Sequence, residues 1–106
     1  MSTDEIIQQM VDRIVLSFHP LRIILFGSYA RGEAGEDSDV DLLVVLSSVE
    51  NKRQTTIAIR RILADFLLPK DILVTTPEEI LRRGESIGSI LRPALREGKV
   101  LYERAA

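Results

Sequence analysis

Two aspartates, Asp39 and Asp41, stand just before an apolar run at residues 42–46. Because alternate residues of a strand point to the same face, a strand here would set the two carboxylates side by side, with α-carbons roughly 6 to 7 Å apart. Carboxylates this close repel each other unless a cation lies between them. Their oxygens suit Mg²⁺ or Mn²⁺, which complete their coordination with waters and substrate phosphates. The pair therefore predicts a divalent metal site that acts on a phosphate compound.

The alternative is that both aspartates are solvated residues at the mouth of a strand, near Glu36 and Asp37 in an acidic loop. The run after Asp41 favours the metal site, because it lacks the apolar and polar alternation of a strand with one face in water.

A third acid, Asp71, precedes another short apolar run. If the two strands are neighbours, its carboxylate can reach the same metal as Asp39 and Asp41. The alternative is an exposed charge between Lys70 and Ile72. We expect the three aspartates to form one site.

Gly27 and Ser28 follow the apolar run at residues 21–26. A glycine at the end of a buried strand lets the backbone approach a ligand, and a helical turn after it directs free N–H groups at an anion. Ser28 adds a hydroxyl donor, and Arg31 lies one turn further on, within reach of a phosphate oxygen. A Gly-Ser pair alone indicates only a turn. Together with the aspartates it predicts a phosphate-binding turn beside a metal site.

The elements that position these residues can be predicted from periodicity. A helix is expected over residues 3–18, with a capping box formed by Ser2 and Glu5. Strands are expected at residues 21–26 and 40–46, with one helical turn at residues 28–31 between them.

Further along, apolar spacing predicts a helix over residues 52–67 and a strand over residues 71–75. Residues 76–79 (TPEE) indicate a strong helix start, with the helix ending at Gly84. A last helix contains Ile87, Ile90, Leu91, Ala94 and Leu95; Pro93 within it predicts a kink or a late start, and residues 99–102 could add an edge strand. This order predicts an α+β or α/β layered fold, with a small mixed sheet of three to four strands covered by helices.

Composition limits the classes of protein that fit. The 106 residues, with 45% hydrophobic and 28% charged side chains, indicate a single domain over residues 1–106. The chain has no cysteine, no apolar run long enough to cross a membrane, and an acidic start unlike a signal peptide, so we expect a cytoplasmic protein. The net charge of −2 argues against general nucleic-acid binding.

The motifs at residues 27–32 (GSYARG) and 38–42 (SDVDL), with a later strand bearing Asp71, resemble the minimal nucleotidyltransferases of the polymerase-beta-like superfamily. The resemblance covers most of the chain. It implies a nucleotidyltransferase fold in which Gly27 and Ser28 bind the triphosphate of ATP or another NTP. It further implies that Asp39 and Asp41 hold two Mg²⁺ ions, and that Asp71 shares one metal and helps to deprotonate the attacking hydroxyl.

The same resemblance suggests a biological setting. Short members of the family are often antitoxins that form hetero-oligomers with a HEPN-domain ribonuclease toxin, and some transfer AMP from ATP to a tyrosine of that toxin. Two alternatives remain open. The chain could be a non-catalytic module that neutralises a toxin by occlusion, or it could transfer a nucleotide to a small molecule or an RNA end.

Other residues favour ordinary roles. We expect His19 to be a helix cap or a surface residue, and Tyr29 and Tyr102 to pack rather than to contact a base. Arg92 and Arg96, four residues apart, could form a basic stripe, but ion pairing with Glu97 or solvation is the simpler reading. The arginine pairs at residues 60–61 and 82–83 are expected on solvated helix faces.

Overall fold

The computed structural model describes residues 2–35, 37–83 and 91–105, and within them four strands and five helices are present. Their order differs from the predicted one only by the short helix α2, which was expected as a single helical turn. In chain order the elements are α1 (Thr3–Phe18), β1 (Arg22–Phe26), α2 (Ser28–Arg31), β2 (Val40–Val45), α3 (Lys52–Ile62), β3 (Lys70–Thr75), α4 (Pro77–Arg83), α5 (Leu91–Glu97) and β4 (Lys99–Glu103).

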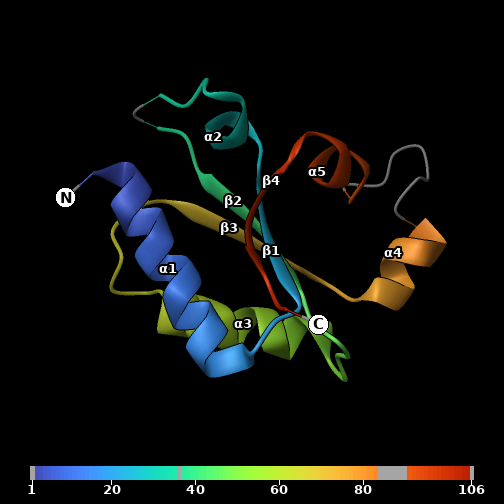
Figure 1. The fold of residues 1–106 in the computed structure, drawn as a ribbon. Coiled ribbons are helices and arrows are strands. Elements are labelled where there is room, and N and C mark those ends of the chain that lie inside the picture. The colour runs from blue at the N-terminus through green and yellow to red at the C-terminus, as the bar shows by residue number, and fades with distance from the viewer. Residues whose placement is uncertain (1, 36, 84–90, 106) are drawn as a thin grey trace.

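The sheet is mixed, as predicted, with strand order β3-β2-β1-β4 (Figure 1). β1 runs antiparallel to both β2 and β4, whereas β2 and β3 are parallel. The end of β1 and the beginnings of β2 and β3 therefore lie at the same end of the sheet. This topology brings together the three segments that carry the candidate site.

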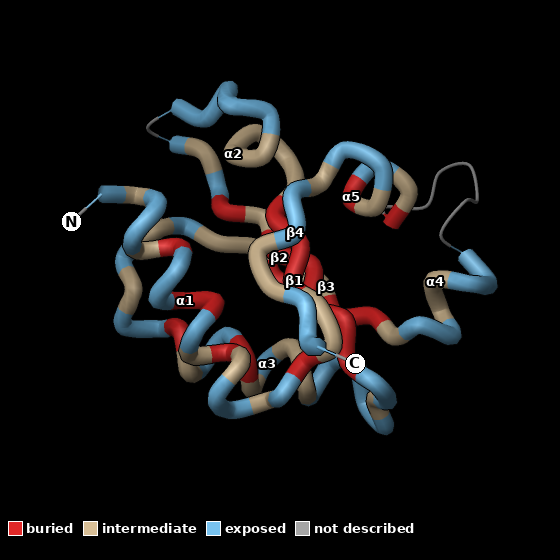
Figure 2. The backbone as a smooth tube through the Cα atoms, viewed as in Figure 1, coloured by how far each residue is buried: buried red, intermediate tan, exposed pale blue. Residues whose placement is uncertain are grey.

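Helices cover both faces of the sheet, and its central strands are almost completely buried (Figures 1 and 2). On one face, α1 and α3 pack through Met10, Ile14 and Ile59 onto a cluster that contains Leu42 and Val44. On the other face, α5 packs through Leu91 and Ala94 onto a second cluster that includes Ile24, Leu43 and Val45. Burial on both faces explains why β2 is apolar at nearly every position, instead of alternating.

The first helix has the predicted bounds, Thr3–Phe18. The side chain of Ser2 accepts a hydrogen bond from the Glu5 amide at 3.2 Å, and the side chain of Glu5 accepts one from the Ser2 amide. These two bonds form the predicted capping box. His19 ends the helix as its C-cap in the left-handed conformation, with φ of 49°, as the cap reading predicted.

The third helix ends at Ile62, five residues before the predicted end. The cause is a contact with α1: the guanidinium of Arg13 donates to the Ile62 carbonyl at 2.8 Å, forms an ion pair with Asp65, and lies 4.4 Å from the centre of the Phe66 ring. Leu63 is nevertheless buried. The apolar spacing thus continues through the turn that follows the helix, which explains the overlong prediction.

At the carboxyl end, α5 is described over Leu91–Glu97 and contains Pro93. The kink or late start predicted from Pro93 stays a prediction, because the residues before Leu91 lie outside the described part of the chain. The predicted end of the preceding helix at Gly84, and the predicted helical residues Ile87 and Ile90, lie outside the described residues. Gly98 follows α5 and its amide donates to the Ala94 carbonyl at 3.0 Å. β4 then pairs with β1 as the predicted edge strand.

None of the helices in the described part of the chain combines the length and apolar character needed to cross a bilayer.

Candidate active site

Three strand ends bring the candidate residues together. In the antiparallel register of β1 and β2, Phe26 lies opposite Asp41, and Gly27 follows Phe26 directly. In the parallel register of β2 and β3, Asp41 lies opposite Asp71. Asp41 therefore sits between the end of β1 and the start of β3. The condition under which Asp71 could share a site with Asp41, that their strands are neighbours, is therefore met.

Two features of position 27 require glycine. Its φ of 75° belongs to the left-handed region, which favours glycine. In addition, a Cβ atom built on Gly27 would overlap the carboxylate oxygen Oδ2 of Asp41. The missing side chain therefore leaves the space into which Asp41 projects, and couples the turn to the aspartate.

The helical turn after Gly27 presents free donors. The amides of Ala30 and Arg31 donate to the Gly27 carbonyl at 3.1 and 3.2 Å. No acceptor within the described residues is bonded to the amides of Ser28 and Tyr29, which begin the turn. These are the donors that an anion at this turn would need.

Arg31 is partly engaged. Its Nε donates to Glu33 at 3.0 Å, and the side chain is about half exposed. Its charge also acts on Asp41, where it lowers the carboxyl pKa. The predicted phosphate-contacting arginine thus lies close enough to Asp41 to favour its charged form.

The electrostatics of the site centre on Asp41. Burial raises the pKa of the Asp41 carboxyl above its ordinary value of 3.8, and the negative charges of Asp71 and Asp39 raise it further, against the opposing effect of Arg31. The three aspartates are therefore close enough to repel one another. A divalent cation would relieve this repulsion, so the donor set fits Mg²⁺ or Mn²⁺.

The three carboxylates are nevertheless not gathered into one ligand set. Among residues 2–35, 37–83 and 91–105, no three histidine, aspartate or glutamate side chains are grouped as a metal would require. Asp71 instead forms an ion pair with Arg60 of α3, at 3.0 Å between Oδ1 and Nη2. Arg60 was expected on a solvated helix face, and its contact with a candidate site residue was missed because the pair joins different elements.

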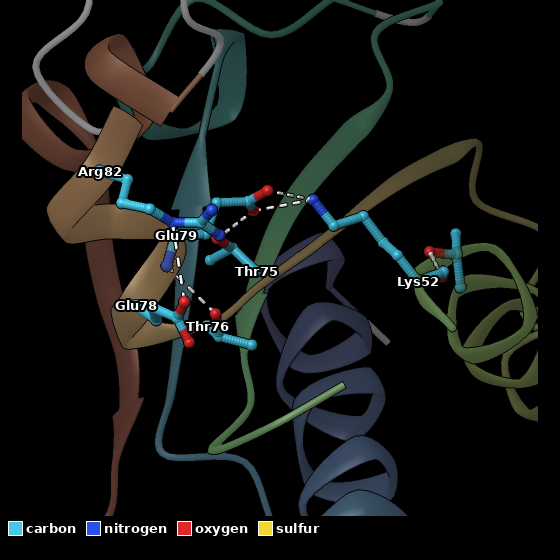
Figure 3. Close-up of polar contacts among 7 residues, drawn as sticks. Lys52, Thr75, Thr76, Glu78, Glu79 and Arg82 are labelled. Carbon is cyan, nitrogen blue, oxygen red and sulfur yellow. Dashed lines mark hydrogen bonds and ion pairs between the residues drawn. The ribbon is translucent and has the colours of Figure 1, made fainter. Parts of the chain in front are cut away.

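A second polar contact that periodicity did not predict lies beyond β3. Glu79 was expected to complete a capping box, and its amide does bond to Thr76 Oγ1 at 3.2 Å. The carboxylate of Glu79, which a capping box would place on the Thr76 amide, accepts hydrogen bonds from Thr75 Oγ1 at 2.6 Å and from Lys52 Nζ at 2.6 and 2.8 Å (Figure 3). This network joins α3, β3 and α4.

The remaining residues have the expected ordinary positions. Tyr29 and Tyr102 are partly buried and pack against the main core cluster. His19 is exposed, as are Arg61, Arg82 and Arg96, while Arg92 is half-buried. The tyrosines are thus part of the packing, as predicted.

Residues 5–99 match the family described as the nucleotidyltransferase domain. Two proteins of Methanocaldococcus jannaschii that are provisionally named protein adenylyltransferases, MJ1305 and MJ0604, are 35% and 36% identical to the chain over 89 and 81 residues. The matches cover 79% and 76% of this chain, and 59% and 77% of the relatives. A third such protein, MJ0141, is 41% identical over 54 residues, 51% of this chain and 54% of its own length. The chain thus spans little more than half the length of two of these relatives.

Solved structures share the fold. A provisionally assigned nucleotidyltransferase from Sulfolobus solfataricus superposes with a TM-score of 0.67 and 21% identity, covering 94% of this chain and 79% of the other. A toxin–antitoxin complex with AMP-PNP gives a TM-score of 0.60 at 19% identity, over 92% and 73% of the two chains. A mutant of the toxin–antitoxin pair MntA–HpeT gives 0.63 at 18% identity, over 98% and 75%.

The fold predicted from the sequence is therefore the one these neighbours share. Because the family match extends over nearly the whole chain, and because its sheet sets a glycine turn beside paired aspartates, the chain belongs to the nucleotidyltransferase domain family.

Proposed function

We propose that this domain transfers a nucleoside monophosphate, AMP from ATP, to a hydroxyl group of a partner protein, a tyrosine of a HEPN-domain toxin, and so acts as an antitoxin in the cytoplasm. The observation that carries the proposal is the meeting of Gly27, Asp41 and Asp71 at one end of the sheet. The names of the Methanocaldococcus relatives support protein adenylylation, and those of two structural neighbours support a toxin partner and an adenine nucleotide.

Each residue has a role that follows from its position. The amides of the turn after Gly27 and the hydroxyl of Ser28 would bind the triphosphate, with Arg31 on a phosphate oxygen. Asp39 and Asp41 would hold two Mg²⁺ or Mn²⁺ ions, and Asp71 would share one of them. Bound divalent ions lower the pKa of an attacking hydroxyl and neutralise charge on the leaving pyrophosphate.

The transfer itself breaks a phosphoanhydride bond of the nucleotide and forms a phosphate ester on the acceptor. The acceptor oxygen bonds to the α-phosphorus of the nucleotide while the bond from that phosphorus to pyrophosphate breaks. The acceptor proton passes to the carboxylate of Asp71. In this structure Oδ1 of Asp71 is paired with Arg60, so the proton would pass to Oδ2, or to Oδ1 after the ion pair opens.

The test uses ATP labelled at the α-phosphate, Mg²⁺ and the candidate toxin. Label should reach the toxin from α-labelled ATP and not from γ-labelled ATP, which separates nucleotidyl from phosphoryl transfer. The Asp39→Ala variant should lose the transfer. The matched control is Asp37→Ala, which removes an exposed acid two residues away and should retain it. Transfer that survives Asp39→Ala would contradict the metal role of Asp39.

The engagement of Asp71 by Arg60 favours a second candidate function, in which the domain neutralises its toxin by occlusion alone. The two functions differ in cells. If an Asp39→Ala/Asp41→Ala double variant protects against the toxin as fully as the unchanged chain, occlusion is the better account. If protection is lost while the complex still forms, transfer is required.

A further inference from the structure

A groove of about 940 Å³ lies beside β3, the strand at one edge of the sheet. α3 forms one wall through Lys52, Arg53 and Arg60, and α4 contributes Glu79 and Arg83 to the other. The floor is the middle of β3, residues 72–74. Since residues on both faces of the strand line the groove, it opens along the edge of the strand and not over one face of the sheet.

This edge offers unpaired backbone groups. The carbonyls of Pro69 and Thr75 accept from the amides of Val40 and Leu46, at 2.8 and 2.9 Å, so odd-numbered residues here direct their backbone groups toward β2. Because backbone direction alternates along a strand, Ile72 and Val74 direct their amides and carbonyls away from β2. The two residues are only 2% and 4% exposed, so the side chains that line the groove must move aside for a partner to reach these groups. No strand of the described part of the chain pairs with that edge.

The charge of the groove is opposite to that of the chain. Its lining contains four basic side chains, Lys52, Arg53, Arg60 and Arg83, and one acid, Glu79, whereas the whole chain has a net charge of −2. Lys52 is bound to Glu79, and Arg60 to Asp71. Among the ion pairs of the described residues none includes Arg53 or Arg83, although the charge of Arg83 acts on Glu79, so both guanidinium groups can still contact a partner.

The groove also has apolar surface. Ile57 of α3 lines it and is 41% exposed, and Leu73 of β3 lines it half-buried. A phosphate chain offers only acceptors and would match the basic side chains alone. An extended polypeptide offers alternating donors and acceptors to the edge of β3, and apolar and acidic side chains to the walls. The combination therefore fits a peptide better than a nucleic acid.

We propose that an extended, acidic segment of the acceptor protein binds in this groove by adding a strand to the free edge of β3, where it pairs with Ile72 and Val74. This proposal rests on the proposed function and names how its acceptor is held. Arg60 lies at the end of the groove where it contacts Asp71, so a segment bound along β3 leads directly to the candidate site. An acidic residue of the segment at that end would compete for Arg60 and release Asp71.

The test uses a fluorescein-labelled peptide of alternating glutamate and valine with a central tyrosine, and measures its binding by fluorescence anisotropy. Two probe controls keep the protein unchanged: the same peptide with alternate amides N-methylated, and one with lysine in place of glutamate. Each should bind about tenfold or more weaker, because the first loses backbone pairing and the second reverses the charge. Equal binding of the N-methylated peptide, or no binding of the original, would overturn the proposal.

Charge reversal on the protein provides a matched comparison. Arg53→Glu/Arg83→Glu changes two exposed arginines that line the groove, whereas Arg61→Glu/Arg82→Glu makes the same changes on the same two helices outside its lining. The first variant should weaken binding about tenfold or more, and the second only slightly. If both variants lose the same affinity for the peptide, the peptide is held by the overall positive charge of the two helices and not by the groove. Tighter binding of a single-stranded oligouridine than of the peptide would identify the groove as a nucleic-acid site instead.

Hydrogen exchange reports the pairing directly. Exchange at the amides of Ile72 and Val74, which have no backbone partner within the described residues, should slow on addition of the peptide, whereas the Leu73 amide, directed at β2, should be protected in both states. Unchanged exchange at Ile72 and Val74 in the presence of bound peptide would exclude strand addition.

Both measurements should be repeated on Asp39→Ala/Asp41→Ala, which cannot carry out the proposed transfer. Binding without transfer by the unchanged chain would sustain the groove and refute the proposed function. If the Arg53→Glu/Arg83→Glu variant transfers the nucleotide to a partner as well as the unchanged chain does, the proposed function would stand and the proposed groove would be refuted.

Discussion

The carboxylate of Asp41 occupies the space that a Cβ atom on Gly27 would need. A Gly27→Ala substitution must therefore displace Asp41 and also hold alanine at a φ of 75°. We expect a loss of stability of about 1 to 3 kcal/mol, and a loss of nucleotidyl transfer that is larger than the instability explains. Chemical denaturation and the labelled-ATP assay measure the two effects.

Gly32→Ala is the control for backbone strain. Gly32 has nearly the same φ, 73°, but an added Cβ would meet nothing within 4 Å. It should cost about 1 kcal/mol and leave transfer intact. If both variants lose transfer equally, the coupling between Gly27 and Asp41 has no functional importance.

An Asp41→Asn substitution should stabilise the protein when Mg²⁺ is absent. It removes a charge that burial and two neighbouring carboxylates disfavour, and a rise in melting temperature of a few degrees is expected. The pKa of Asp41 is raised, so the unchanged protein regains this stability as the pH falls and the carboxyl is protonated. The difference between the two proteins should therefore shrink as the pH falls through the raised pKa of Asp41. Added Mg²⁺ should stabilise the unchanged protein alone; equal stabilisation of both would place the metal elsewhere.

Removing Arg60 should release Asp71. The two side chains are 48% and 47% exposed, so their ion pair contributes at most about 1 kcal/mol to stability. Arg60→Ala should lower the Mg²⁺ concentration needed for half-maximal transfer, because Asp71 is no longer shared. Arg61→Ala removes the same charge from the adjacent position and should change neither property. A Mg²⁺ requirement that is identical in all three proteins would mean that the Arg60 contact does not control Asp71.

Glu79 should make the fold sensitive to acid. Burial opposes ionisation of this side chain, which is 16% exposed, but the hydrogen bonds from Lys52 and Thr75 outweigh it and hold the pKa of Glu79 below its ordinary value of 4.5. The resulting stability is complete above the unfolded pKa and is lost as the pH falls through the lower folded pKa. In Glu79→Gln, the dependence of unfolding free energy on pH below about 4.5 should be shallower. Glu78→Gln, which changes an exposed neighbour, should keep the full slope.

Much of the fold could be predicted from local signals. Residues 2–20 contain a capping box, helical apolar spacing and a terminating His-Pro, and α1 has the predicted bounds. The edge strand after Gly98 and the strands that carry Asp41 and Asp71 were likewise predicted from short apolar runs and the residues that bound them, whereas the pairing of the last two entered only as a condition. In each case, the determinants lie within a few residues of the element.

The features that the sequence did not predict depend on contacts between distant segments. α3 stops at Ile62 because Arg13, 49 residues earlier in the chain, bonds to its last carbonyl. Asp71 is paired with Arg60, and Glu79 with Lys52, across different elements. Helical periodicity reports which face of a helix is apolar, but it does not report which polar groups meet after the elements have packed.

β2 pairs antiparallel with β1 and parallel with β3, which places the proposed chemistry at three strand ends. Helices and connecting segments form the surface around these strand ends. If the proposed function and the proposed groove hold, reaction and recognition are encoded largely in separate parts of the chain, with the contact between Arg60 and Asp71 as their link. Changes along α3 and α4 can alter which acceptor is held without disturbing Gly27 or Asp41. Such a division would let one small domain be redirected to new targets over evolutionary time while its reaction stays the same.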